Sequence, residues 1–282
     1  MIAVGLALLS ALLFGGMSVA LRMALQREPD AALGTIATVV PAIGVAVVAA
    51  VAESPSRGLH LSGAWPFMLA GLLSPGAAQI LITYAIRDSG ASRVSMVFGT
   101  APLVSVTIAL VVLGEPVRAP LMVGAVLVVA GGVELTRERG RPGHLRRIGL
   151  VYAFAGATLF AVRDNLVRHL AVGRTAVPPG VAAAAALIGG GLVVVLWARR
   201  GFSTRWLPFL PAGLLFGGSY VSLFEAYYRG RVTVIAPLVA AESLVGVALA
   251  ILFLRDSERV GRRLLIGAAL IVAGGALIGA FR

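Results

Sequence analysis

The stretch LMVGAVLVVAGG, from Leu121 to Gly132, returns near the end of the chain as LLIGAALIVAGG, from Leu264 to Gly275. Eight of the twelve positions are identical. Both stretches are uncharged and belong to longer apolar runs, which are typical of helices that cross a membrane. The same helix is therefore predicted twice. The alternative is that two Gly- and Ala-rich membrane helices became alike independently, through composition alone.

A second similarity pairs the first apolar run with one beyond the middle of the chain, at an offset of 146 residues. For a third pair of runs two alignments compete. One places Arg93 on Arg231, and the other places Pro102 on Pro237, three residues out of step with the first. The register is open there. The positions matched at the 146-residue offset are Ala7 with Ala153, Ala11 with Ala157, Phe14 with Phe160 and Arg22 with Arg168.

Composition assigns the chain to the membrane. Of its 282 residues 59% are hydrophobic and 13% are charged, and the mean hydropathy is +0.96. A soluble domain could not bury that much apolar surface. The first apolar run lacks the basic start and the cleavage site of a signal peptide, so we expect it to remain as a helix. Apolar runs and loop signals predict helices at 2–24, 33–52, 65–86, 93–113, 118–135, 147–170, 177–198, 207–228, 232–254 and 260–281.

A polar stretch at residues 136–146 divides these helices into two sets of five. An odd number of helices per repeat makes the second copy enter the membrane from the opposite side. The predicted fold is therefore an all-α integral membrane protein with ten transmembrane helices, arranged as two inverted five-helix repeats. The first repeat covers residues 1–135, a cytoplasmic linker covers 136–146, and the second repeat covers 147–282.

The net charge of +12 comes from 24 basic residues that are all arginine. Nearly all of them lie in loops or at helix ends, which indicates membrane topology and argues against nucleic acid as a partner. Sixteen lie on one side of the predicted membrane and seven on the other, while Arg163 lies inside a helix. Because the arginine-rich side is normally cytoplasmic, this bias predicts that both termini lie outside.

Several short motifs occur in an order that is typical of one family of membrane proteins. Two five-helix halves are each closed by a Gly-Gly pair, Gly15-Gly16 is interpreted as a break in the first helix, and Leu113-Gly114-Glu115 follows the fourth. In this the chain resembles a ten-helix member of the drug/metabolite transporter superfamily, EamA-like branch, over essentially its whole length. The second half departs from the pattern with Leu254-Arg255-Asp256-Ser257-Glu258, where Asp256 or Glu258 would stand in for Glu115.

The resemblance implies export of amino acids or related metabolites, or flipping of a modified lipid. It also implies two EamA-like repeats with both termini cytoplasmic, against the arginine bias. From the resemblance and the repeat we expect a multi-pass secondary transporter of the cytoplasmic (inner) membrane that moves a small polar or amphipathic metabolite, with export the favoured direction, by alternating access. Its partners are then a small-molecule substrate and the lipid bilayer, and a monomer is sufficient. The alternative is a lipid-linked metabolite flippase of the same fold.

An enzyme is the competing class. The chain has no cysteine, and its histidines, His60, His144 and His169, lack metal-ligand spacing. We find no nucleophile elbow, no His-Glu-x-x-His and no nucleotide-binding loop. The sequence therefore predicts neither a metal, a cofactor nor a catalytic residue, and a membrane-embedded enzyme is the less favoured reading.

Ionisable side chains within the membrane are costly and normally face a cavity or a partner. Arg163, Asp164 and Asn165 lie in the sixth predicted helix, where the equivalent part of the first helix is Met17-Ser18-Val19. Such asymmetry suggests a substrate site, with Arg163 binding a carboxylate or phosphate. In the alternative reading, Asp164 pairs with Arg168 one turn on, and Arg163 extends to the membrane surface.

Two further carboxylates are candidates for substrate binding and for proton coupling. Glu225 is predicted near the same membrane face as Arg163, and the two alternatives for it are a pair with Arg163 or a pair with Arg229 at i+4. Glu242 lies near the middle of the ninth predicted helix with Ser243 beside it, and a buried carboxylate there is suited to carry a proton. Aromatic and polar side chains that could complete the pocket are Phe14, Ser18, Gln79, Tyr84, Tyr220 and Tyr227.

Overall fold

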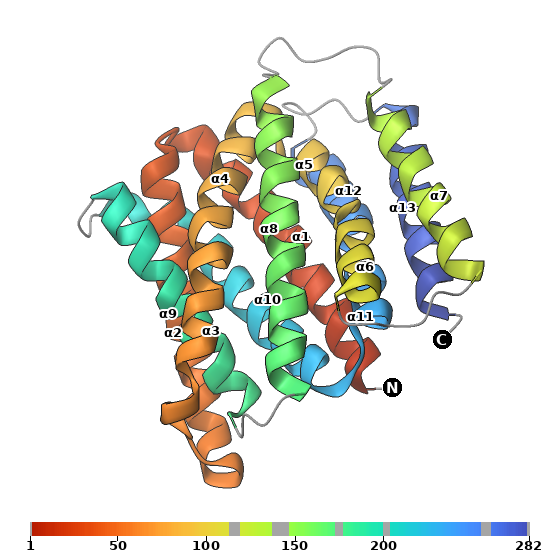
Figure 1. The fold of residues 1–282 in the computed structure, drawn as a ribbon. Coiled ribbons are helices and arrows are strands. Elements are labelled where there is room, and N and C mark those ends of the chain that lie inside the picture. Colours follow the sequence, from red (N-terminus) through yellow and green to blue (C-terminus); the bar gives the residue numbers. More distant parts are fainter. Residues whose placement is uncertain are drawn as a thin grey trace.

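The computed structural model describes residues 2–112, 119–136, 147–172, 177–199, 204–254 and 261–280. Within these ranges the regular structure is entirely helical, and the helices stand side by side with both termini at the same end of the molecule (Figure 1). The elements are α1 (Ile2–Arg27), α2 (Ala31–Arg57), η1 (Leu61–Gly63), α3 (Trp65–Gly71), η2 (Leu72–Ala77), α4 (Ala78–Ser89), α5 (Ala91–Phe98), α6 (Ala101–Val111), α7 (Ala119–Thr136), α8 (Arg147–Val172), α9 (Pro179–Ala198), η3 (Thr204–Phe209), α10 (Leu210–Arg229), α11 (Val232–Val239), α12 (Glu242–Phe253) and α13 (Arg262–Ala280).

Every predicted apolar segment forms a helix over most of its described residues, and three are interrupted. The third is interrupted at η2, where Ser74 has non-helical φ and ψ angles next to Pro75. The fourth and ninth each contain a two-residue turn, between α5 and α6 and between α11 and α12. The motif residues Leu113-Gly114-Glu115 and 255–258, and nearly all of the predicted linker, lie outside the described residues.

The predicted break at Gly15-Gly16 is wrong, because α1 is one continuous helix. Gly15 serves close packing instead: a Cβ atom placed there would lie 2.8 Å from the Val245 side chain and 3.0 Å from the backbone nitrogen of Gly246 on α12. Small residues let membrane helices approach closely. The glycine that suggested a kink is therefore a contact point between two straight elements.

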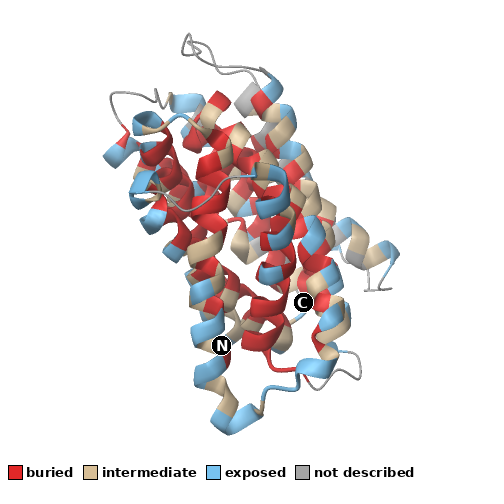
Figure 2. Cartoon of the chain, turned by 90° about the vertical axis from the view of Figure 1, so that its left-hand side faces the viewer, coloured by how far each residue is buried: buried red, intermediate tan, exposed pale blue. Residues whose placement is uncertain are grey.

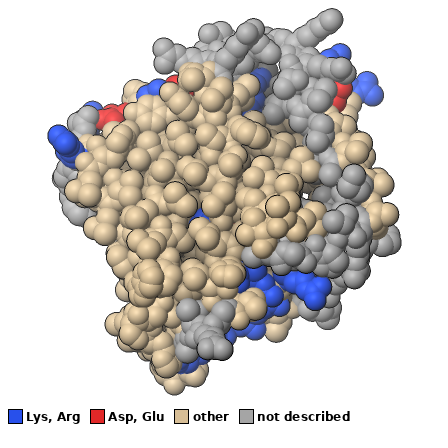
Figure 3. All heavy atoms as spheres, viewed as in Figure 1, with Lys and Arg blue, Asp and Glu red and all other residues tan. Residues whose placement is uncertain are grey.

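Within the described ranges, six helical stretches are long and apolar enough to cross a membrane, so the chain is a multi-pass integral membrane protein. Figure 3 agrees, since charged side chains gather towards the two ends of the described surface and leave a mostly uncharged band between them. Buried residues fill the interior and exposed ones lie on the outer faces of the helices (Figure 2). The six stretches are Ile2–Arg27, Ala31–Arg57, Trp65–Ser89, Ile148–Val172, Pro179–Ala198 and Thr204–Arg229; two shorter apolar helices are Glu242–Phe253 and Leu265–Leu277.

Helix packing follows a paired pattern. Helix α1 packs on α10, and α8 packs on α4; α2 packs on α10, and α9 packs on α3 and η2. Three further contacts join predicted segments of like order in the two halves: α2 with α9 (second and seventh), α5 with α12 (fourth and ninth) and α7 with α13 (fifth and tenth). Helices α7 and α13 cross at Gly131 and Gly267, where a Cβ on either residue would lie within 2.8 Å of the other residue's carbonyl oxygen. The two similar stretches, 121–132 in α7 and 264–275 in α13, thus pack against each other.

The turns in the fourth and ninth segments give an offset for the pair of segments whose register the sequence left open. Helix α5 begins at Ala91 and α11 at Val232, while α6 begins at Ala101 and α12 at Glu242. Both pairs of starts are 141 residues apart. This offset differs from those of both sequence alignments. The alignments matched identical Arg-Val and Ala-Pro-Leu residues, whereas the offset matches the backbone turns.

Two equivalent arginines cap helix ends in the same manner. Arg22 on α1 donates hydrogen bonds from Nη1 to the carbonyl oxygens of Ile86 at 3.3 Å and Arg87 at 2.8 Å, near the end of α4. Arg168 on α8 donates from Nη1 to the carbonyl oxygen of Tyr227 at 2.8 Å, near the end of α10. Ile86 and Tyr227 are again 141 residues apart. The Arg87 and Tyr227 carbonyls lie in the last helical turn, where carbonyl oxygens have no N–H group further along the helix. The Ile86 carbonyl also accepts a hydrogen bond from the Gly90 backbone N–H at 3.0 Å.

Candidate substrate site

A small internal cavity of about 40 Å³ lies where α1, α8, α10 and α12 meet the turn between α5 and α6. Several of the predicted site residues line it, among them Arg163, Asp164 and Glu242. The described residues that line it are Ser10, Phe14, Phe98, Ala101, Phe160, Arg163, Asp164, Ser219, Tyr220, Leu223, Val239 and Glu242. The cavity is therefore both aromatic and charged.

Arg163 is almost fully buried, with 1% of its side chain exposed. Its guanidinium lies 4.5 Å from the ring centre of Tyr220, 4.9 Å from that of Phe160 and 5.7 Å from that of Phe224. Rings at such distances attract a cation, more strongly where water is excluded. Arg163 thus does not extend to the membrane surface. Its Nε and Nη1 have no hydrogen-bond partner within the described part of the chain, so they can bind an anionic group.

Asp164 pairs with its neighbour rather than with Arg168. Its Oδ1 lies 2.8 Å from Arg163 Nη2, and this contact is an ion pair that does not meet hydrogen-bond geometry. Asn165 turns away from the cavity and donates from Nδ2 to the carbonyl oxygens of Ser105 at 3.1 Å and Ala161 at 2.9 Å. Asn165 therefore ties α8 to α6, while the two preceding residues face the cavity.

Glu242 is buried and is the first residue of α12, directly after the turn that interrupts the ninth segment. The expectation of a mid-helix position is corrected: the residue lies at the start of a half-helix, where backbone N–H groups present their positive end. Ser243 beside it is fully buried against Gly99, since a Cβ at Gly99 would clash with the Ser243 hydroxyl. Ser243 is thus part of the α5–α12 crossing rather than of the cavity lining.

Aromatic rings form the rest of the wall. The ring of Phe14 lies 5.5 Å from that of Phe98 and 5.7 Å from that of Phe160, and the last two lie 5.6 Å apart. Tyr220 donates a 2.6 Å hydrogen bond to the carbonyl oxygen of Ser74 in the interrupted third segment. The irregular backbone at η2 is therefore fixed by the same side chain that stacks beneath Arg163.

Sequence reasoning missed seven lining residues: Ser10, Phe98, Ala101, Phe160, Ser219, Leu223 and Val239. The Ser10 and Ser219 hydroxyl oxygens lie 3.0 Å apart, and Ser219 also donates to the Ser10 carbonyl at 3.1 Å, joining α1 to α10. Ser10 is one turn before Phe14 on the same face of α1, and that spacing was the available signal. No sequence signal pointed to Phe98, because its place beside the cavity follows from the turn after α5.

The remaining predicted residues lie outside the cavity lining. The Ser18 hydroxyl donates to the Phe14 carbonyl at 3.2 Å within α1. Gln79 is fully buried on α4, and neither its amide nitrogen nor its amide oxygen has a partner among the described residues. Tyr84 belongs to a separate ring cluster with Tyr152 and Trp197, at centre distances of 6.2 and 5.9 Å. Tyr227 is fully buried on α10, and its hydroxyl has no partner in the described ranges.

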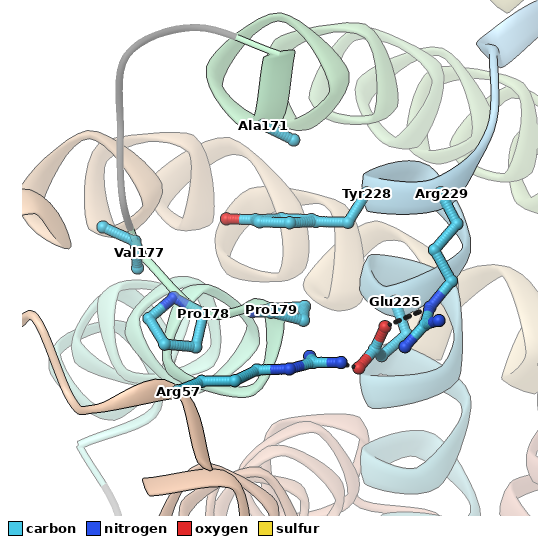
Figure 4. A pocket seen from close by; sticks show the side chains of 8 residues that line it. All are labelled: Arg57, Ala171, Val177, Pro178, Pro179, Glu225, Tyr228 and Arg229. Carbon is cyan, nitrogen blue, oxygen red and sulfur yellow. Dashed lines mark hydrogen bonds and ion pairs between the residues drawn. The ribbon is translucent and has the colours of Figure 1, made fainter.

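Glu225 lines a different pocket at the end of α10 (Figure 4). Its Oε1 accepts a 2.7 Å hydrogen bond from Arg57 on α2, and its Oε2 accepts one of 2.7 Å from Arg229, the i+4 neighbour. The i+4 pairing is therefore the one present, and Glu225 does not pair with Arg163. Among the described residues, no group of three or more histidine, aspartate or glutamate side chains is placed to hold a metal ion.

Comparison with known proteins identifies the family. The EamA-like transporter family model matches residues 1–135 and 147–280. A solved structure titled "Crystal structure of protein" superposes with a TM-score of 0.73 at 21% identity, over 98% of this chain and 94% of that chain, and so shares the fold. No curated protein matches the sequence significantly. With the family model matching nearly the whole chain, this protein belongs to the EamA-like transporter family.

Proposed function

We propose that this chain is a secondary transporter with ten transmembrane helices in two inverted five-helix repeats, 1–135 and 147–282. The interrupted third, fourth and ninth segments each count as one crossing in this scheme. The substrate binds in the central cavity and reaches each side of the membrane in turn. The observation that carries the proposal is the position of that cavity, buried between the two halves with Arg163, Asp164 and Glu242 on its wall.

Support for the repeat comes from contacts between the halves that occur twice, once with each half in each role. Contact of α1 with α10 corresponds to contact of α8 with α4, and the Arg22 cap corresponds to the Arg168 cap. The two ranges that the family model matches coincide with the two proposed halves. An internal two-fold relation of this kind is what allows a fold to open alternately to either face.

The cavity lies across the join between the halves, but its charges come from one half. Phe14 and Phe160 are equivalent at the 146-residue offset, and both line it. Glu242 is equivalent to Ala101 at the 141-residue offset, and Arg163 is equivalent to Met17. A polar group of the substrate would therefore bind against α8 and α12, with an apolar part against the rings of the first half.

The substrate class that fits is an amino acid or a related amphipathic metabolite. Arg163 has free donors for a carboxylate, and Asp164 and Glu242 offer acceptors for an ammonium. Small-molecule pockets measure about 300–1,000 Å³, far above the 40 Å³ seen here. The helices must therefore move apart to admit a substrate. We assign export across the cytoplasmic membrane as the direction, with Glu242 as the candidate proton carrier.

The test is flux in proteoliposomes for Glu242→Gln and Arg163→Ala, compared with Arg205→Gln at the exposed Arg205–Glu28 ion pair, whose Nε–Oε2 distance is 3.0 Å. Both cavity variants should lose flux while staying folded and monodisperse, and Arg205→Gln should keep it. Wild-type flux from both cavity variants would rule out this site.

The substrate is best found by comparing the metabolites that cells export with and without the protein. A solute that accumulates outside only when the protein is present supports the transporter. Movement of a lipid-linked compound alone would identify the flippase instead. If neither moves, the transport proposal fails.

A further inference from the structure

A pocket that the transport proposal leaves unused measures about 430 Å³ and lies where the ends of α2, α8 and α10 meet the start of α9 (Figure 4). This volume falls within the range of about 300–1,000 Å³ typical of small-molecule sites. The lining residues are Arg57, Ala171, Val177, Pro178, Pro179, Glu225, Tyr228 and Arg229. Two successive prolines stiffen one side of it, and the Arg57 side chain runs from beside Pro178 to Glu225 on the opposite side (Figure 4).

Two guanidinium groups converge on one carboxylate in this pocket. Arg57 and Arg229 each lie 2.7 Å from an oxygen of Glu225, and their side chains are 38% and 37% exposed. Each guanidinium has five N–H donors, and Glu225 takes one from each. Glu53 lies 3.7 Å from Arg57 and also accepts a hydrogen bond from the Gly180 backbone nitrogen at 3.1 Å. Two lining arginines therefore face one lining carboxylate, with donors to spare.

Tyr228 adds a hydroxyl group that has no hydrogen-bond partner among the described residues. Its ring is held by a stacked contact with Phe67 at a centre distance of 6.4 Å. In Figure 4 the hydroxyl points across the pocket towards Val177, on the side where Arg57 and Pro178 also lie. Although the oxygen is buried, no hydrogen bond to it forms within the described part of the chain. An unsatisfied buried hydroxyl is costly, and a ligand in the pocket would relieve that cost.

We propose that this pocket binds a small anion bearing a carboxylate or phosphate group, held by Arg57, Arg229 and the Tyr228 hydroxyl. Glu225 is the resident anion, and the ligand displaces it. Because the Arg57–Glu225 pair joins α2 to α10, binding also releases one helix of each half from the other at this end of the molecule. The site is separate from the central cavity and does not depend on what the cavity transports.

The test is calorimetric titration of the purified full-length protein in detergent with inorganic phosphate, at constant ionic strength adjusted with sodium chloride. Wild type should bind saturably. Arg57→Gln and Arg229→Gln should each weaken binding about tenfold, which corresponds to about 1.4 kcal/mol, and Tyr228→Phe should weaken it less. Glu225→Gln should tighten binding by about the same tenfold factor, since it removes the competing carboxylate.

The opposite signs separate a ligand site from a purely structural ion pair. Partly exposed ion pairs contribute little to stability, so all four variants should fold, which thermal unfolding checks. Arg205→Gln, at the exposed pair with Glu28, is the matched control and should bind phosphate as wild type does. No phosphate binding by wild type, or a Glu225→Gln variant that binds no more tightly, would overturn the proposal.

The anion could come from solution or from a lipid headgroup, and two membranes distinguish these sources. In phosphatidylcholine nanodiscs, phosphate should bind in both cases. In phosphatidylglycerol nanodiscs, undiminished binding identifies a soluble anion as the ligand, and loss of binding identifies the anionic headgroup. Failure to bind phosphate in either nanodisc would count against the site.

Discussion

A buried arginine is the feature around which the central cavity is organised. Its rarity within a membrane helix was visible in the sequence, and so was its absence from the equivalent position, Met17. The means of accommodating it was not visible, because Tyr220 and Phe224 come from α10, more than fifty residues further along the chain. Such rings compensate part of the cost of removing a cation from water. Sequence could therefore nominate Arg163 but could not supply its surroundings.

Two buried tyrosines on α10 should respond differently to loss of the hydroxyl group. Tyr220→Phe leaves the buried Ser74 carbonyl without its 2.6 Å hydrogen bond, and we expect a loss of stability of about 1–3 kcal/mol. The Tyr227 hydroxyl lies beside the Asp164 carboxylate but meets no hydrogen-bond geometry among the described residues, so Tyr227→Phe should cost less stability than Tyr220→Phe. Thermal unfolding in detergent measures both. Equal destabilisation by the two substitutions would contradict the hydrogen-bond assignment.

At the scale of elements, helix limits followed closely from apolar runs, whereas interruptions did not. Pro75 does mark a break, yet Pro41 lies within the uninterrupted helix α2. The turn at Ala240-Ala241 has no sequence signal, because alanine favours a continuous helix. The Gly15-Gly16 pair wrongly predicted a break, because Gly15 accommodates a neighbouring helix rather than a bend. Local sequence thus specifies where a membrane helix begins and ends better than where packing interrupts it.

The α7–α13 crossing should not tolerate larger side chains. Gly131→Ala and Gly267→Ala would each place a Cβ within 2.8 Å of the opposite backbone carbonyl, so the helices must separate and unfolding should occur at a lower temperature. Gly5 and Gly44 are the controls, since nothing lies within 4 Å of a Cβ at either position. Alanine at Gly5 or Gly44 should be neutral or mildly stabilising. Equal losses at all four positions would argue against a specific crossing.

The two arginine caps provide a test of equivalence between elements. Arg22→Gln and Arg168→Gln each remove a charged donor from carbonyl oxygens at a helix end, at 2.8 Å in both cases. We expect comparable destabilisation of about 1–2 kcal/mol, in line with hydrogen bonds from charged groups. Amide exchange should rise at the end of α4 in the first variant and at the end of α10 in the second. Exchange that rises elsewhere would contradict the assigned roles.

At the scale of the whole molecule, the class and the family followed from sequence, while the register of the repeat needed the backbone. Composition and the doubled Gly-Gly helices sufficed for the first two. The 141-residue offset emerged from the starts of α5, α6, α11 and α12, where matching letters had favoured other alignments. Near-identical apolar residues carry little register information, because many of them pack equally well against lipid.

Topology can be tested on a chain that has no native cysteine. Single cysteines at His60 and Arg199 occupy equivalent loops of the proposed repeats, and both positions are exposed. With an inverted repeat, an impermeant maleimide should label the two from opposite sides of the membrane, and Pro29→Cys should follow Arg199→Cys. The arginine bias places Pro29 and Arg199 in the cytoplasm. Labelling of His60→Cys and Arg199→Cys from the same side would exclude the inverted arrangement.

The two equivalent joints between the halves differ in chemistry. At the 141-residue offset Glu225 corresponds to Tyr84, so the carboxylate that holds Arg57 takes the place of a ring that packs on Trp197. Dissolved salt screens exposed ion pairs over about 8 Å at physiological strength, but it does not weaken contacts between rings. High salt would thus weaken the Arg57–Glu225 contact but not the contact between Tyr84 and Trp197.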